Sequence, residues 1–411
     1  MTHINETARQ ILRKNDRGGY TVPTDGLYPY QWNWDSVFAA WGFATFDNDR
    51  AWTEVETLFS GQWDDGMVPH IIFHQSDPGY FPGPDVWGTN KTPQTSGISQ
   101  PPVAATLVRK IYEMDPETGR TRLAALYPRM VAWHRWWHEV RCAPGPACIT
   151  HPWESGRDNC PDWDVGMANV DGSNVGPYQR RDTGHVDASM RPGKEDYDRY
   201  IAILQFGKAC GWNHAEIMAN GPFLMADPGI TFILLRAHRD LIALGQELGE
   251  DVSEITGWAD ALEAAVPSIW NPDLGAYDAR DIRTGTWANN LSSAAYLFLY
   301  AGIENPQMDA QMQRTWDAVT YGIPSSDPEA THFDPRRYWR GPMWPVVNSL
   351  IAVGLKDSSR DADEARLRRE TATLIKKSGF YEYFDPVDGT PCGGSNFTWT
   401  AAIWLTWAGR D

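Results

Sequence analysis

The segment ESGRDNCPDWD, residues 154–164, places Glu154, Asp158, Asp162 and Asp164 beside an aromatic ring and several turn-forming residues. One interpretation is a solvated turn, because Asp, Asn, Gly and Pro satisfy and bend the backbone of loops. The other is an acid that keeps its proton near neutral pH, which requires an apolar or like-charged environment that disfavours ionisation. The segment is therefore a candidate source of a catalytic acid, and Asp158 is the candidate residue.

Other loop segments carry a similar mixture of carboxylate, aromatic, amide and guanidinium groups, mostly at the start of an apolar helix-like stretch. They are YPYQWNWDSVFAAWG (28–42), GQWDDGMVPHI (61–71), TSGISQPPV (95–103), RRDTGHVDASMRPGKEDYDRY (180–200), HFDPRRYWRGPMWPVVNS (332–349) and GFYEYFDPVDGTPCGGSNFTWTAA (379–402). Each alone is compatible with a capped turn. A ring-shaped helical fold would gather all of them around one pocket, and the number of such loops favours that interpretation.

Cleavage of a glycosidic bond requires carboxyl groups of the kind that these loops carry. The transition state lies between two carboxyl groups, one protonated to donate to the leaving oxygen and one ionised to activate water or attack carbon. Asp158 and Glu382 belong to different loops, which suits two groups that approach a sugar from opposite faces. No metal ion or organic cofactor is required, so we expect none.

The elements that position these loops are predicted to be helices. Apolar residues recur at three-and-four spacing in residues 102–114, 119–140, 227–248, 253–268, 306–320, 343–355 and 361–377, and residues 1–18 have the pattern of a polar amphipathic helix. Strand-like alternation is scarce. Long Gly-, Pro- and Trp-rich stretches (61–101, 150–195, 270–290 and 331–345) separate the helices, and loops of this length are usually functional. We expect one all-α domain over residues 1–411, a closed ring of helical hairpins with its loops at one end.

Composition excludes several classes of partner. The 411 residues carry a formal net charge of −17, which argues against nucleic acid and anionic membrane surfaces. No apolar run approaches the roughly 18 residues of a membrane span. Five cysteines, without a CxxC or HExxH motif, favour reduced thiols in a cytoplasmic protein without a metal site, although Cys142 and Cys148 could bridge. A small anionic substrate stays compatible with the charge, because one buried Arg sets the local potential.

Four motifs together resemble glycoside hydrolase family 63: QWNWDS (31–36), ESGRDN (154–159), YWRGPMWPVVN (338–348) and YEYFDPVDGTP (381–391). Within that family they are similar to the short bacterial branch that hydrolyses glucosylglycerate and mannosylglycerate. The resemblance runs from about Tyr28 to Trp399. It implies an (α/α)6 barrel and an inverting hydrolysis of the α-glycosidic bond.

The resemblance also implies roles for individual residues. Asp158 matches the general acid, Glu382 the general base, and Asp35 a carboxylate that binds the cleaved hexose. The family pattern implies that the hexose also contacts Trp32, His70 and Trp344 and that the glycerate side is formed by Tyr28, Gln100, Arg191, Tyr197, Tyr338 and Trp339. A guanidinium such as that of Arg191 can hold a carboxylate through two parallel hydrogen bonds. For Asp35 and Arg191 the structural alternatives are a helix cap and an exposed loop residue.

Spacing alone does not separate Asp158 from the other acids of its segment, since only the match to GRDN selects it. We expect Glu154 and Arg157 to orient and tune the acid and Asp164 to be structural. The segments 61–101 and 176–196 are candidates for lids that close over substrate.

Three other functions remain open from the sequence. A relative that acts on a neutral α-glucoside such as glucosylglycerol would keep Asp158, Glu382 and Asp35 and would not depend on Arg191. A sugar epimerase would use histidines, and a sugar-binding protein would use the same acids without catalysis. The sequence also leaves open the choice between glucose and mannose and the oligomeric state, a homo-oligomer included.

Overall fold

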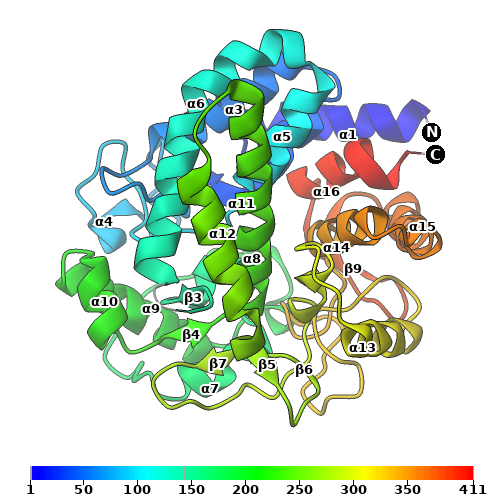
Figure 1. Cartoon of the computed structure of the whole chain (residues 1–411). Helices are drawn as coiled ribbons and strands as arrows, with labels where there is room; N and C mark the ends of the chain where they lie inside the picture. The colour runs from blue at the N-terminus through cyan, green and yellow to red at the C-terminus, as the bar shows by residue number, and fades with distance from the viewer. Residues whose placement is uncertain (1, 143–144, 411) are drawn as a thin grey trace.

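A computed structural model describes residues 2–142 and 145–410, and these residues form a mostly helical protein (Figure 1). The main helices are α1 (Thr2–Asn15), α2 (Asn33–Phe43), α3 (Asn48–Ser60), α5 (Ala104–Met114), α6 (Pro116–Trp136), α9 (Lys194–Ala209), α10 (His214–Asn220), α11 (Pro228–Leu248), α12 (Ser253–Ala265), α13 (Pro306–Asp317), α14 (Pro345–Asp357), α15 (Asp361–Ser378) and α16 (Thr398–Ile403). All seven segments with helical periodicity contain a helix, and so does the polar segment at the start of the chain. The prediction of a helical protein is confirmed.

Capping residues set several of these helix boundaries. The Asp227 side chain accepts a hydrogen bond from Gly229 N, Pro228 occupies the first turn of α11, and Gly249 ends the helix in a left-handed conformation. Asp115 caps α6 in the same way by accepting from Thr118 N. Helices α3, α9 and α10 have no counterpart among the predicted helices. In α9, charged residues fill the first turns and interrupt the apolar spacing.

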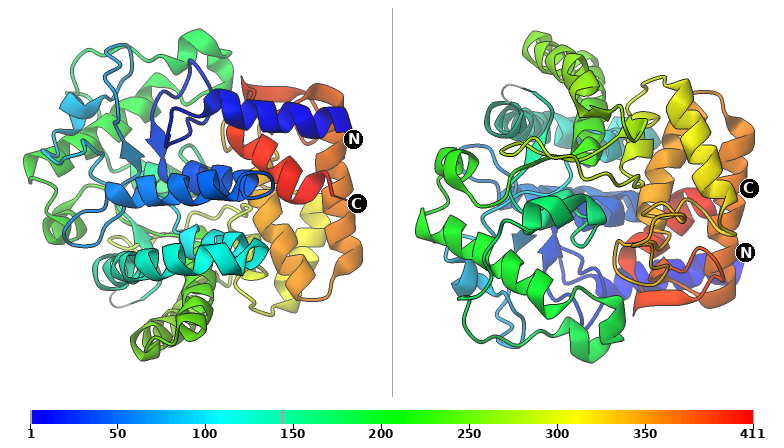
Figure 2. Two further views of the ribbon diagram at one scale, coloured as in Figure 1. Left: turned by 90° about the horizontal axis from the view of Figure 1, so that it is seen from above. Right: turned by 90° about the horizontal axis from the view of Figure 1, so that it is seen from below.

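The inner helices form a closed sequence of contacts. Helix α2 packs on α5, α5 on α11, α11 on the short 3₁₀ helix η6 (Ala295–Phe298), η6 on α14, α14 on α16, and α16 on α2. Outer helices pack against this ring, with α3 on α2, α6 on α5, α12 on α11, α13 on η6, α15 on α14 and α1 on α16. The helices are therefore arranged as two layers around a common centre. Figure 2 shows the molecule from above and from below, with the N- and C-termini on the same side.

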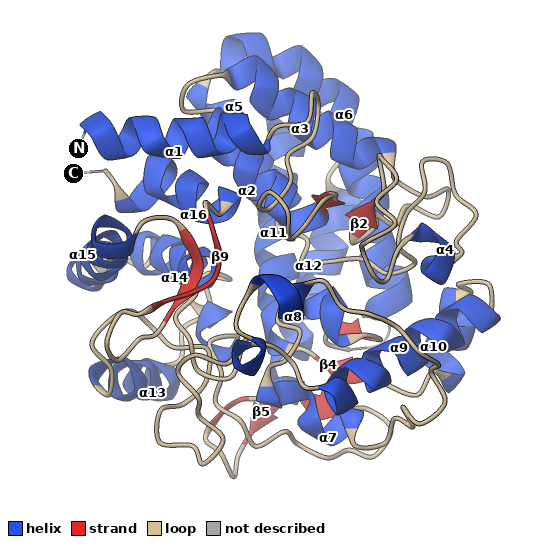
Figure 3. Ribbon diagram, turned by 180° about the vertical axis from the view of Figure 1, so that it is seen from behind, coloured by secondary structure: helices blue, strands red, loops and turns tan. Residues whose placement is uncertain are grey.

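Pairing between short strands anchors the long loops that connect the helices (Figure 3). β1 (Gln31–Trp32) pairs with β2 (Ile71–Ile72), and β8 (Tyr381–Phe384) pairs with β9 (Pro391–Ser395), both antiparallel. β4 (Met225–Ala226) lies between β3 (Cys148–Ile149) and β7 (Arg280–Asp281), and β5 (Trp270–Asn271) pairs with β6 (Ala276–Tyr277). The pair β1–β2 thus joins the 61–101 loop to the start of α2, and β8–β9 holds Glu382.

The five cysteines are all free thiols, so Cys142 and Cys148 do not form a bridge. Within the described ranges, no helix combines the length and the apolar character needed to cross a bilayer.

Candidate active site

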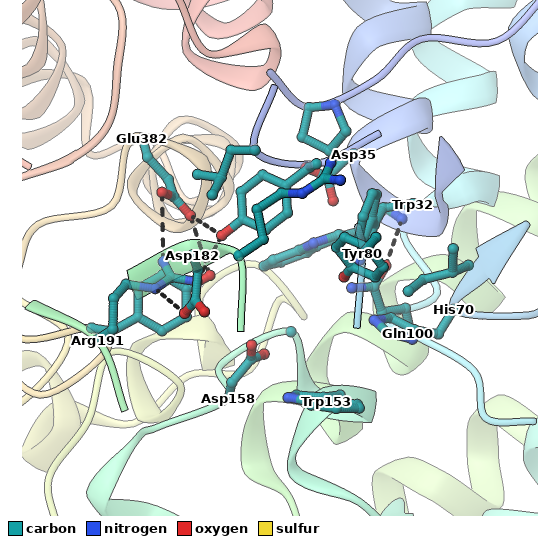
Figure 4. Close-up of a pocket in the computed structure, with 18 of the residues that line it drawn as sticks. Trp32, Asp35, His70, Tyr80, Gln100, Trp153, Asp158, Asp182, Arg191 and Glu382 are labelled. Atoms are coloured by element: carbon teal, nitrogen blue, oxygen red, sulfur yellow. Dashed lines mark hydrogen bonds and ion pairs between the residues drawn. The ribbon is translucent and has the colours of Figure 1, made fainter. Parts of the chain in front are cut away.

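The loops meet at a cavity that holds most of the residues expected from the sequence (Figure 4). Its empty space is about 820 Å³, counted to its opening into solvent. Ten of the expected site residues line it: Tyr28, Trp32, Asp35, His70, Gln100, Asp158, Arg191, Tyr197, Tyr338 and Glu382. This volume falls in the range of small-molecule sites.

Asp158 is held by the turn that follows the 3₁₀ helix η2 (Pro152–Ser155). Gly156 has a φ of 67°, and a Cβ there would lie 2.8 Å from the indole of Trp34, so the turn requires glycine. The Tyr200 hydroxyl of α9 donates to the main-chain carbonyl of Asp158 at 2.9 Å. The backbone that carries the acid is therefore fixed from two sides.

The environment of Asp158 favours its protonated form. Burial raises the pKa of its carboxyl to about 7, the nearby carboxylate of Glu382 acts in the same direction, and Arg191 opposes both. Among the hydrogen bonds of the described residues, no other residue donates to this carboxyl. The group can therefore hold a proton near neutral pH.

Glu382 lies on β8, and its carboxylate accepts three hydrogen bonds. Tyr28 and Tyr338 donate their hydroxyls to Oε1, each at 3.2 Å, and Gly394 donates its main-chain N–H to Oε2 at 3.0 Å. Burial raises its pKa, whereas Arg191 and these donors favour the ionised form. Because hydrogen bonds to a carboxylate oppose its protonation, Glu382 is better suited than Asp158 to carry the negative charge.

The turn GGSN at residues 393–396 explains part of this geometry, although its sequence alone indicates no role. Gly393 has a φ of 71°, and a Cβ there would lie 2.4 Å from Glu382 Oε2. Glycine is therefore needed at Gly393 for the strand to pass so close to the carboxylate, and the next residue supplies the N–H donor.

Arg191 is 6% exposed and lies next to the Glu382 carboxylate. Its Nη2 donates to the Tyr28 hydroxyl at 2.9 Å, its Nη1 lies 3.8 Å from Glu382 Oε2, and its guanidinium covers the ring of Tyr338 at 3.9 Å. Its Nε donates to Asp182 Oδ2 at 2.9 Å. The cavity thus contains a buried cation with one amino group, Nη1, that makes no hydrogen bond.

Another part of the cavity wall combines an aromatic face with neutral polar groups. Burial, reinforced by Glu382, raises the pKa of Asp35 well above its usual value. Burial, with a contribution from His151, lowers the pKa of His70, so its imidazole is neutral and can donate and accept. Gln100 Oε1 accepts a hydrogen bond from Trp34 N at 3.2 Å. Such groups can bind the hydroxyls of a sugar.

Trp339 and Trp344, which are expected to face substrate, are not among the residues that line this cavity. Their rings stack on each other with centroids 3.7 Å apart and an interplanar angle of 3°, and Tyr383 stacks on Trp344. Only 1% of each tryptophan is exposed. Both faces of Trp344 and one face of Trp339 are therefore occupied, and the stack supports Tyr338 and the β8 strand.

The sequence reasoning missed several residues of the wall. Tyr80, Phe81, Trp153, Arg181 and Asp182 line the cavity in addition to the expected set. Tyr80 and Phe81 come from the 61–101 loop and Arg181 and Asp182 from the 176–196 loop, which the sequence singles out only as segments. The sequence does not indicate that Asp182 pairs with Arg191 nine positions later, because residues that pair within a long loop follow no regular spacing.

The other acidic residues of segment 154–164 form ion pairs or hydrogen bonds outside the cavity. Asp162 accepts from Arg157 at 2.6 Å and from Asn290 at 2.6 Å, and Asp164 pairs with Arg340. Neither lines the cavity. Asp164 is structural, as expected.

The expected role of Glu154 and Arg157 in tuning the acid is corrected. Glu154 pairs with Arg141 at 2.9 Å, and Arg157 pairs with Asp162 and Asp227, so neither donates to or accepts from the Asp158 carboxyl. Both act on the acid only through the backbone, since they anchor the turn that carries it.

Within residues 2–142 and 145–410, no cluster of three or more His, Cys, Asp or Glu side chains has the arrangement of a metal site.

Comparison with known proteins agrees with the chemistry of this cavity. Residues 28–400 match the family described as mannosylglycerate hydrolase MGH1-like glycoside hydrolase domain. A mannosylglycerate hydrolase of Thermus thermophilus is 44% identical over 411 residues, which cover 97% of this chain and 99% of that protein. The glucosylglycerate hydrolase of Mycolicibacterium hassiacum is 34% identical over 443 residues, covering 99% of this chain and 98% of that protein.

Among solved structures, a GH63 mannosylglycerate hydrolase from Thermus thermophilus in complex with Tris and D-glycerate superimposes with a TM-score of 0.95 at 43% identity. The match covers 98% of this chain and 99% of that chain.

Proposed function

The chain belongs to the mannosylglycerate hydrolase MGH1-like branch of glycoside hydrolase family 63, and from this premise we propose that it hydrolyses mannosylglycerate, glucosylglycerate or both. One observation carries the proposal. A single cavity contains two carboxyl groups with opposite hydrogen-bonding environments and a buried guanidinium beside one of them. Relatives named for both substrates support the same choice.

In the proposed reaction, Asp158 donates its proton to the glycosidic oxygen as the bond to the anomeric carbon breaks. Glu382 takes a proton from a water molecule, whose oxygen attacks the anomeric carbon from the opposite face. The products are a free hexose with inverted configuration and glycerate. Asp158 ends ionised and Glu382 protonated, and exchange of protons with solvent restores both groups.

We assign Arg191 to the carboxylate of the glycerate. Its buried Nη1 has no hydrogen-bond partner among the described residues, Arg191 lines the cavity, and a guanidinium matches the two oxygens of a carboxylate. Tyr28 and Tyr338 are proposed to contribute at the same side, because both lie between the guanidinium and Glu382. Asp35, Trp32 and His70 are proposed to hold the hexose.

The proposal extends to the architecture. We infer that the ring of inner and outer helices is an (α/α)6 barrel in which η6 takes the place of one inner helix, and that it forms a single catalytic domain. Five free thiols support a cytoplasmic location. The oligomeric state is not assigned.

The segments 61–101 and 176–196 are proposed to act as lids. An ion pair between Arg181 and Asp77 joins them, and the rings of Phe81 and Tyr178 stack with centroids 4.8 Å apart. Both segments supply cavity residues, so their opening would release product. Crystal B-factors as low in both segments as in the barrel helices, with and without ligand, would contradict this role.

The test is to incubate the protein with each glycerate conjugate and follow the anomeric protons by NMR. Inversion of an α-linked substrate releases the β-hexose first, before mutarotation. Release of the α-hexose first would exclude inversion, and the absence of any free hexose from either conjugate would exclude the proposed substrates.

A further inference from the structure

Asp182 is a carboxylate in the cavity that the proposed reaction does not use. It opens the short helix α8 (Asp182–His185) and lies in the wall beside Arg191. Its Oδ2 accepts from Arg191 Nε at 2.9 Å, and both of its oxygens accept from Arg180, at 3.0 Å and 2.6 Å. One carboxylate thus holds two guanidinium groups.

We propose that Asp182 is a positioning residue that fixes which edge of the Arg191 guanidinium faces the carboxylate of the substrate. The inference rests on the proposed function, in which Arg191 binds the glycerate carboxylate. It goes further by assigning the selectivity for an anionic aglycone to a pair of residues, with Asp182 as the member that does not touch substrate.

The hydrogen bonds of Arg191 identify the edge that is left open. Nε is taken by Asp182, and one N–H of Nη2 is taken by the Tyr28 hydroxyl. The buried Nη1 has no hydrogen-bond partner. A guanidinium has five N–H donors, so the edge formed by Nη1 and the second N–H of Nη2 remains for a carboxylate, which binds through two parallel hydrogen bonds.

Asp182 also limits how closely Arg191 approaches the base. Arg191 Nη1 forms an ion pair with Glu382 Oε2 at 3.8 Å, and a small rotation would shorten this contact to a direct hydrogen bond. The pull of Asp182 on Nε opposes that rotation. Arg180 braces Asp182 from its other side and is itself fixed by donating to the Pro192 carbonyl at 2.7 Å.

The charge of Asp182 affects the pH dependence of activity, which would not change if Asp182 had a purely structural role. Asp182 raises the pKa of Asp158, whereas Arg191 lowers it. The other titratable groups that act on Asp158 or are acted on by it are Glu382, Asp35, Tyr200 and Tyr338. Removal of the negative charge at Asp182 leaves Arg191 less compensated, so the acid ionises at lower pH and the basic limb of the activity profile moves down.

The experiment measures kcat and KM for mannosylglycerate, and for methyl α-mannoside as a neutral comparison, across pH. Asp182→Ala is expected to raise KM for mannosylglycerate by about tenfold or more, the effect of losing a charged hydrogen bond, with little change for the neutral glycoside. Asp182→Asn keeps an oxygen that can accept from Nε, so it should recover most of the KM. Both variants should shift the basic limb to lower pH.

The matched control is Asp187→Asn, a change in the same loop at an exposed carboxylate that caps Ser189 and lies outside the cavity. It should alter neither KM nor the pH profile. The inference is overturned if Arg191→Ala selectively impairs the charged substrate while both Asp182 variants behave like the control. If Arg191→Ala impairs neither substrate selectively, the assignment of Arg191 to the glycerate carboxylate fails as well. Should Asp182→Ala not fold, an unchanged basic limb in Asp182→Asn is sufficient to overturn the inference.

Discussion

The hydroxyl of Tyr28 donates a hydrogen bond to Glu382 Oε1 at 3.2 Å, across a separation of 354 residues in the sequence. The same hydroxyl accepts from Arg191 Nη2 at 2.9 Å. A cation, a phenol and a carboxylate therefore form one chain. Since a phenol polarised by a cation is a stronger donor, this chain stabilises the ionised form of Glu382.

Substitution of either proposed catalytic carboxyl should remove nearly all turnover. Asp158→Asn loses the proton donor and Glu382→Gln loses the proton acceptor, and each such loss costs about 10²- to 10⁴-fold in kcat. The measurement is kcat with purified protein whose circular dichroism matches the wild type. Asp164→Asn, which changes a rival acid paired with Arg340 outside the cavity, should retain most activity. More than a few per cent activity in either catalytic variant would refute the role assigned to that residue.

Tyr28→Phe should move the acidic limb of the activity profile to higher pH. The variant removes a hydrogen bond that favours the ionised form of Glu382, so the pKa of this base rises and activity is lost earlier as the pH falls. The check is the pH dependence of kcat/KM. Tyr20→Phe, a change at a ring that stacks on His74 away from the cavity, should leave the profile in place. An acidic limb that does not move would show that Tyr28 does not tune the base.

Arg191→Ala should separate charged from neutral substrates. The loss of a charge-assisted, two-point contact is expected to lower kcat/KM for the glycerate conjugates by about 10- to 100-fold more than for a neutral α-glycoside, each enzyme being compared at its own pH optimum because Arg191 also acts on Glu382. Parallel kinetics on the two substrate types make the comparison. Arg199→Ala, on α9 and outside this cavity, is the control. Equal losses on both substrate types would favour the alternative of a neutral aglycone.

The protonation of Asp158 should appear in both activity and stability. Because the acid must be protonated, kcat/KM should fall as the pH rises through about 7. The folded-state pKa lies above the value of about 3.9 in unfolded chains, so this group reduces stability progressively between pH 4 and pH 7 and by a constant amount above. Asp158→Asn should therefore gain stability relative to the wild type over this window, by roughly 4 kcal/mol at most. Urea unfolding at several pH values measures the difference, and a difference that does not depend on pH would show that Asp158 ionises normally.

Arg157→Ala should destabilise the fold more than an ordinary surface change. Arg157 is 3% exposed and pairs with Asp162 at 2.6 Å and Asp227 at 2.8 Å, so its removal leaves two buried carboxylates without a cation. Breaking such pairs costs about 3–5 kcal/mol of unfolding free energy. Arg120→Ala, which removes an exposed pair with Glu247, should cost about 1 kcal/mol or less. Chemical denaturation compares the two, and equal effects would mean that the Arg157 network does not anchor the acid turn.

The helices could be located from sequence because their signal is local. Apolar spacing, the cap at Asp227 and the proline that follows it are properties of neighbouring residues, and the structure reproduces them in α11. Helix α9 escaped prediction because its first turns are charged and face solvent or the loop. Half of the ten expected cavity residues occur in the four motifs that resemble a known family, and the other half were expected from the pattern of that family.

The sequence by itself thus determined a helical protein, a family and ten residues that share one cavity. Only the tertiary structure decided that Trp339 and Trp344 face each other, that Asp162 and Asp164 are held by arginines, and that Asp182 and Gly393 shape the site. The physical reason is that ion pairing, stacking and close backbone approach depend on distances between residues far apart in the chain. No local spacing records such distances, and packing of the loops over the helical ring sets them.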